Sequence, residues 1–132
     1  MRRLALAIPL ILACQAAGAQ PRGHGPVPHR VGQCVRTTIA RVGQRLEDGS
    51  TGQPIANSGS AVSFANGLAQ ISYDQVPRVN RSRRGDPVRI CLRELPRNCP
   101  PGDDRGKIYR TTNLRTGQSW TLPDSQHICG GA

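Results

Sequence analysis

The chain has 132 residues, with 18 lysine and arginine side chains against 8 aspartate and glutamate side chains, a formal net charge of +10 at pH 7, and only 3% aromatic residues. This length excludes two full domains. So few aromatic residues predict a modest core, of the kind that small exported domains reinforce with covalent cross-links.

The first 19 residues have the three parts of a secretory signal peptide in the usual order. Arg2 and Arg3 give a positive start, residues 4–13 form an apolar run, and Ala17-Gly18-Ala19 is a small-residue cleavage site. A bilayer-spanning helix needs about 20 apolar residues, so this run is too short to be one. We therefore expect residues 1–19 to be removed and the rest to be exported.

A second cleavage site lies inside the same segment. Ile11-Leu12-Ala13-Cys14 is similar to the lipobox of bacterial lipoproteins, in which the cysteine becomes lipidated, although Leu12 is bulkier than that pattern prefers. We favour the cut after Ala19, which gives a soluble periplasmic or extracellular protein. Lipidation at Cys14, which gives a membrane-anchored protein, is the alternative.

The mature chain begins with a Gly-, Pro- and His-rich stretch over residues 20–33, which contains His24 and His29 and is typical of a flexible leader. The predicted domain covers residues 34–132. Its first segment, residues 34–46, has apolar residues at helical spacing but is rich in β-branched residues. We predict a strand with a bulge or bend at Gly43, and a helix is the alternative.

The clearest local signal is the sequence SAVSFANGLAQISY, in which Asn66-Gly67 separates two alternating runs. This pattern predicts a β-hairpin with a two-residue turn. That turn would pair Phe64 with Ala69 and Val62 with Ile71. The predicted inner face of the hairpin consists of Val62, Phe64, Ala69, Ile71 and Tyr73.

Three more strands follow, separated by segments rich in turn-forming residues. They are predicted over residues 87–93, 107–113 and 119–122, with loops at residues 47–59, 76–86 and 99–106. Five or six short strands with regular turn signals predict an all-β fold, a small antiparallel barrel or sandwich.

Four cysteines remain in the predicted domain, and an exported protein is expected to pair them as two disulfides. We favour Cys91–Cys99, which closes a short loop, together with Cys34–Cys129, which joins the two ends of the domain. The spacing lacks the close pairs of structural zinc motifs, so we expect no metal site and no other cofactor.

Four sequence stretches together, GDPVRICL, CPPGDDRGKIY, TNLRTGQSW and PDSQHICGGA, suggest a family. With them the chain resembles a group of small exported bacterial proteins, over residues 34–132. The resemblance implies export and a disulfide-bonded domain. It implies no activity and therefore no catalytic residue.

Two groups of residues could carry enzyme chemistry. Asp124, Ser125 and His127 have the residue types of a hydrolase triad, but close sequence neighbours rarely reach its geometry, and no nucleophile-elbow motif surrounds the serine. Asp103 and Asp104 could act as a paired acid and base or bind calcium, which needs six to eight oxygen ligands. Surface turns are the favoured interpretation of both groups.

The strongest functional signal is a cluster of seven arginines within twenty residues, which we take as the candidate binding residues for an anionic partner: Arg78, Arg81, Arg83, Arg84, Arg89, Arg93 and Arg97. Guanidinium groups bind phosphate and carboxylate with two hydrogen bonds at once. A solvated basic surface without a specific ligand is the alternative. Nucleic acid is an unfavoured partner, since export removes it and few aromatics are available for base stacking.

These observations predict a non-enzymatic binding module that attaches to an anionic component of the cell envelope or to an acidic protein. The alternatives are a small enzyme that uses Asp103, Asp104 or His127, and a passive structural protein of the envelope.

Overall fold

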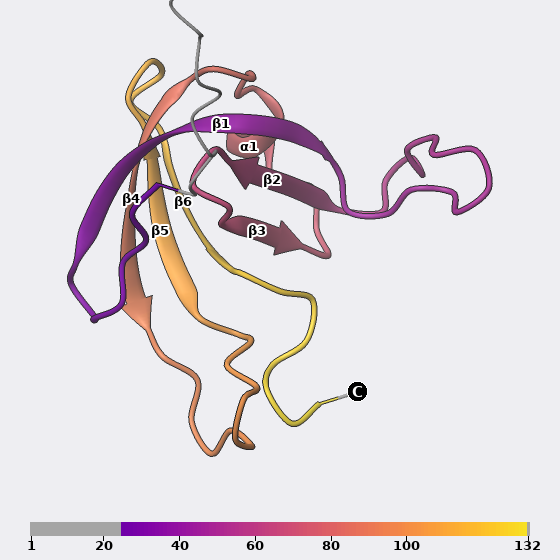
Figure 1. Cartoon of the computed structure of the whole chain (residues 1–132). Helices are drawn as coiled ribbons and strands as arrows, with labels where there is room; N and C mark the ends of the chain where they lie inside the picture. The colour runs from indigo at the N-terminus through magenta and orange to yellow at the C-terminus, as the bar shows by residue number, and fades with distance from the viewer. Residues whose placement is uncertain (1–24, 132) are drawn as a thin grey trace, which may run out of the picture.

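Six antiparallel strands form one curled sheet, a half-barrel, in a computed structural model that describes residues 25–131 (Figure 1). The order across the sheet is β3-β2-β1-β4-β5-β6. The elements are β1 (Cys34–Gln44), β2 (Ser60–Phe64), β3 (Ala69–Ser72), α1 (Pro77–Asn80), β4 (Pro87–Glu94), β5 (Ile108–Asn113) and β6 (Ser119–Pro123). The predicted all-β class is confirmed. The predicted signal peptide, cleavage sites and Cys14 lie outside the described residues.

Strand β1 is the longest strand and joins the two halves of the sheet. Its first part pairs with β4 and its second part with β2, and the register shifts between Ile39 and Arg41. The strand prediction for this segment is confirmed, but the bulge at Gly43 is wrong. Gly43 pairs regularly with Ala61, whereas the extra residue lies where β1 changes partner and must bend.

The β2–β3 hairpin forms as predicted, but its register differs by one residue. Val62 pairs with Gln70 and Ser63 with Ala69, because the turn has three loop residues and places Gly67 at φ 89°. A shift of one residue turns every side chain of a strand to the other face. Gln70 therefore lies in the core, and the predicted placement of Ala69, Ile71 and Tyr73 on the inner face is wrong.

The core fills the concave side of the sheet, and α1 lies across one end of it (Figure 1). A loop is predicted over residues 76–86, but Pro77 begins a single helical turn, for which its fixed φ is suited. This turn carries Val79 into the core, where it is fully buried. The core residues are Ile39, Val62, Phe64, Val79, Val88, Ile90, Leu92, Tyr109 and Trp120.

The Gln70 amide connects β3 to the opposite end of the sheet. Its Nε2 donates to the carbonyl oxygens of Tyr109 at 2.7 Å and Leu122 at 3.0 Å. Its Oε1 accepts from Thr111 Oγ1 at 2.6 Å and from the indole Nε1 of Trp120 at 2.9 Å. One buried side chain thus bridges β3, at one edge of the sheet, to β5 and β6 at the other edge. Without these bonds the half-barrel would be open between its two edges.

Two disulfides are present, but the favoured pairing is wrong. Cys34 bonds to Cys91 and Cys99 bonds to Cys129. Because β1 lies beside β4, Cys34 and Cys91 are directly opposite residues, with 4.0 Å between their Cα atoms. Cys99 lies in the loop after β4, where it meets the C-terminal segment instead. Each bond closes a long loop and should stabilise the fold by about 4 kcal/mol on the chain-entropy model.

Residues 25–33, which the sequence assigns to the leader, contact the domain. Pro28 is buried, the amide of Asn66 donates to the carbonyl of Pro26, and the backbones of Gly32 and Gln33 bond to Leu92. The packed domain therefore begins before Cys34. Among the described residues, no helix has the length and apolar character needed to cross a membrane.

Candidate functional site: an arginine face on the outer side of the sheet

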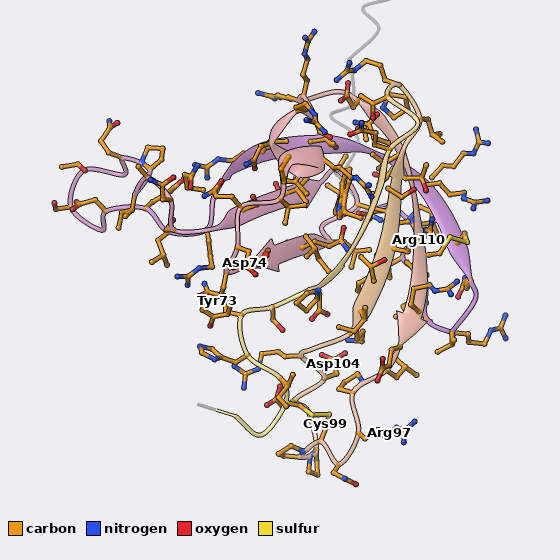
Figure 2. The ribbon with its side chains drawn as sticks, turned by 180° about the vertical axis from the view of Figure 1, so that it is seen from behind. Tyr73, Asp74, Arg97, Cys99, Asp104 and Arg110 are labelled. Atoms are coloured by element: carbon orange, nitrogen blue, oxygen red, sulfur yellow. A yellow bond between two sulfur atoms is a disulfide. The ribbon has the colours of Figure 1, made fainter. Side chains whose placement is uncertain are left out.

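Four arginines that form no ion pair within the described residues lie on the outer side of the sheet, on three neighbouring strands. Arg36 comes from β1, Arg89 and Arg93 come from β4, and Arg110 comes from β5. All four are exposed. We call this group the arginine face; Figure 2 shows Arg110 projecting from β5.

The strand register places Arg36 and Arg89 as close to each other as a sheet allows. Backbone hydrogen bonds join Leu92 to Gln33 and Ile39 to Asp86, each at 3.0 Å. Hydrogen-bonded and non-hydrogen-bonded pairs alternate along an antiparallel ladder. The Arg36–Arg89 pair therefore occupies a non-hydrogen-bonded position, where facing side chains are nearest.

No arginine of the face forms an ion pair within the described residues, although the exposed Glu94 lies beside Arg93 at the register shift of β4. The ion pairs in residues 25–131 are Arg41–Glu47, Arg105–Asp103, Lys107–Asp104 and Arg115–Asp86. None of them includes an arginine of the face. Like charges directly opposite each other on neighbouring strands destabilise a sheet, so a bound anion would remove an unfavourable interaction.

The seven arginines predicted as one cluster are divided among three places. Arg89 and Arg93 lie on the arginine face, Arg89 in the regular alternation of β4 and Arg93 at its register shift. Arg97 lies near Cys99 in the loop after β4, well away from Arg110 (Figure 2). The other four lie in or after α1 at the end of the half-barrel: Arg78, Arg81, Arg83 and Arg84.

Two of the arginines near α1 are bonded to the first residue of β6 and to the residue before it. Arg78 Nη1 donates to the carbonyl of Ser119 at 2.9 Å, and Arg81 Nη2 donates to Gln118 Oε1 at 3.2 Å. These bonds satisfy part of the donor capacity of both guanidinium groups. They join α1 to β6 and give the two side chains a structural role.

Asp86 is the buried anion of this end of the molecule. Arg115 donates to it from Nε at 2.5 Å and from Nη2 at 2.9 Å. The amide of Asn113 donates at 2.8 Å and the backbone N–H of Arg83 at 2.9 Å. The hydrogen bonds from Arg115 are the main reason that the pKa of Asp86 lies well below its ordinary value.

Asp103 and Asp104 are both occupied by neighbouring cations. Arg105 donates to both oxygens of Asp103, each at 2.8 Å, and Lys107 pairs with Asp104. These contacts lower the pKa of both carboxyl groups. A general acid at neutral pH needs a raised pKa, so the arrangement is that of ionised turn residues.

Ser125 and His127 are neighbours, but the serine hydroxyl bonds to the backbone. It donates to the carbonyl of His127 at 2.8 Å and contacts Asp124 Oδ1 at 3.0 Å. A nucleophile would instead donate to the imidazole ring of its base. The described residues also contain no group of three or more His, Cys, Asp or Glu side chains that could hold a metal ion.

We expect the free energy of unfolding to fall as the pH drops below about 4, because several carboxyl groups are more acidic in the folded state. Ser50 and Thr51 donate to Asp48 and lower its pKa from 3.8 to about 2. Asp86 and Asp103 are shifted in the same direction. Their stabilisation is complete above the unfolded pKa of 3.8 and is lost as the pH falls through the folded values.

Urea unfolding between about pH 7 and pH 2 measures this effect, with the steepest loss expected below about pH 4. An unchanged urea midpoint down to about pH 2 would contradict the predicted linkage.

Sequence reasoning missed Arg36, Arg110 and the cation partner Arg115. Arg110 alternates with Tyr109 in a predicted strand and could have been placed on the outer side. Its position beside β4 requires the strand order, which no local pattern contains. Arg36 was missed for the same reason, since its neighbour Arg89 lies more than fifty residues away.

No protein family, no curated protein and no solved structure matches this chain. The fold and the site therefore define it only as a small, basic, disulfide-bonded β-sheet protein with an arginine face.

Proposed function

We propose that this chain is an exported binding module that attaches to an anionic, phosphate-bearing component of the cell envelope through its arginine face. The observation that carries the proposal is the exposed Arg36–Arg89 pair, in which two like charges face each other without an ion-pair partner in the described chain. The pair costs free energy in the isolated protein, and an anion that bridges the two guanidinium groups recovers it.

The shape of the surface favours an extended partner over a small molecule. The arginines project from the outer side of a curled sheet, and adjacent strands of a sheet lie about 4.8 Å apart. Several phosphate groups of a lipid surface can contact such an array at once, and each arginine near an anionic membrane contributes about 1 kcal/mol. The two disulfides are compatible with the oxidising compartment that the proposal requires.

The test replaces the four arginines of the face by glutamine and measures sedimentation with vesicles that contain phosphatidylglycerol. At about 1 kcal/mol for each arginine, the partition coefficient should fall at least about a hundredfold. Wild-type binding should also weaken steeply as salt is added, because the interaction is electrostatic.

A matched control removes the same charge elsewhere, by replacing Arg78, Arg83, Arg84 and Arg97 with glutamine. This variant should lose less than about tenfold, because these arginines lie away from the outer sheet face. Equal losses in the two variants would show that net charge alone drives binding and would reject the arginine face. Failure of the wild type to bind vesicles or purified lipopolysaccharide would reject the envelope partner and leave a passive structural role.

A further inference from the structure

The Cys34–Cys91 disulfide lies inside the arginine face. Arg36 follows Cys34 by two residues on β1, Arg89 precedes Cys91 by two residues on β4, and Arg110 is the direct partner of Cys91 on β5. Residues two apart on a strand, and residues directly opposite on adjacent strands, share one face of a sheet. Cys34 is exposed, so a solvent molecule can reach one end of the bond.

We propose that Cys34–Cys91 is a thiol–disulfide exchange site that reacts preferentially with anionic thiols. The surrounding arginines attract a negatively charged thiolate, and they stabilise the thiolate that leaves when the bond breaks. A more stable leaving thiolate leaves faster. The inference uses the arginines of the face but does not depend on the proposed envelope partner.

The exchange runs in two balanced steps. The incoming thiolate attacks Cys34 Sγ, a new S–S bond forms, and the old bond breaks with its electron pair on Cys91 Sγ. A second incoming thiolate then attacks the sulfur of the first, which releases a small disulfide and leaves Cys34 as a thiolate. Two external thiols are oxidised to one small disulfide, and the protein disulfide is reduced to two thiolates. The two protons that the external thiols released on ionising are taken up from solvent when the cysteine thiolates are protonated.

The second disulfide has a different environment. Gly130, next to Cys129, donates to the carboxylate of Asp103 at 3.0 Å, and Arg105 near the bond is already paired with that carboxylate. Cys129 is buried. Arg97 also lies near this bond, and its backbone carbonyl faces both sulfur atoms. One such arginine beside a carboxylate stabilises a thiolate less than the three arginines around Cys34–Cys91. The molecule therefore contains its own reference bond, at which exchange should be slow.

The sheet does not depend on Cys34–Cys91 to hold its strands together. The β1–β4 ladder runs from Cys34 to Thr38 on β1. At its two ends, the backbone N–H of Leu92 donates to the carbonyl of Gln33, and the backbone N–H of Ile39 donates to the carbonyl of Asp86. Reduction of this bond should therefore leave the two strands paired, so the two cysteines stay near each other and can be oxidised again.

The experiment treats the folded protein with reduced glutathione, which is anionic, and in parallel with cysteamine, which carries a positive charge. Free thiols are trapped by alkylation, and peptide masses assign them to each cysteine. We expect glutathione to open Cys34–Cys91 at least about tenfold faster than Cys99–Cys129. We also expect added salt to lower the ratio of the glutathione rate to the cysteamine rate at Cys34–Cys91.

Replacing Arg36, Arg89 and Arg110 by glutamine should slow glutathione about tenfold. The cysteamine rate should change less, because weaker stabilisation of the leaving thiolate is offset by weaker repulsion of the cationic thiol. The variant with glutamine at Arg83, Arg84 and Arg97, which removes the same number of charges elsewhere, should open Cys34–Cys91 at the wild-type rate. Equal rates at the two disulfides, or the same loss in both variants, would overturn the proposal. Normal exchange in a protein that does not bind vesicles would reject only the envelope partner, and normal vesicle binding with no preferential exchange would reject only the exchange site.

Discussion

Replacing Gln70 by leucine should lower the free energy of unfolding by about 4 kcal/mol, because two buried donors lose their acceptor and each costs about 1–3 kcal/mol. The donors are Thr111 Oγ1 and the indole N–H of Trp120, both of which bond to the Gln70 amide oxygen. Leucine has a similar volume, so the loss reports the hydrogen bonds rather than a cavity. The closure between β3 and β6 should weaken with them.

Chemical denaturation of the Gln70→Leu protein measures this loss, and Trp120 fluorescence reports the same site. The matched control is Gln53→Leu, which makes the same change at an exposed position of the loop after β1. The control should change stability by less than about 0.5 kcal/mol. Equal stability of the two variants would contradict the role assigned to the buried amide.

Replacing Asp86 by alanine should destabilise the fold by about 3 kcal/mol, since it leaves a partly buried cation and a buried amide without their acceptor. Arg115 loses both of its bonds to the carboxylate, and the Asn113 amide nitrogen loses Asp86 as an acceptor while keeping Ser82. The turn from β5 to β6 would then be held to the segment after α1 by fewer bonds, those of Asn113 to Ser82 and of Arg81 to Gln118.

Thermal unfolding of the Asp86→Ala protein tests this expectation against Asp74→Ala, an exposed carboxylate outside any ion pair of the described chain. The control should unfold within a few degrees of the wild type. If the Asp86→Ala protein also unfolded within a few degrees of the wild type, the network around Asp86 would not be a major source of stability.

The local pattern of the chain predicts the strands well, because strand alternation and turn residues are features of a few consecutive positions. It predicts the hairpin at Asn66-Gly67 but not its register. Two-residue and three-residue turns both suit that dipeptide, and only the second lets the Gln70 amide reach Thr111 and Trp120. The choice is made by a polar partner forty residues away, which no local pattern can contain.

The strand order explains the other differences. The sequence shows that Cys34 and Cys91 lie in strands, but not that these strands are neighbours, so loop length favoured other pairings. The same strand order places Arg36 opposite Arg89 and Arg110 opposite Cys91. The linear cluster of seven arginines therefore contains only two members of the arginine face, Arg89 and Arg93, and its other five members lie elsewhere in the fold.

The most direct test of the arginine face is an NMR titration that follows the Nε–Hε signals of the arginines while micelles of short-chain phosphatidylglycerol are added. The account predicts that the signals of Arg36, Arg89, Arg93 and Arg110 shift first and saturate together. Larger shifts at Arg78, Arg83, Arg84 or Arg97, or equal shifts at every exposed arginine, would contradict it.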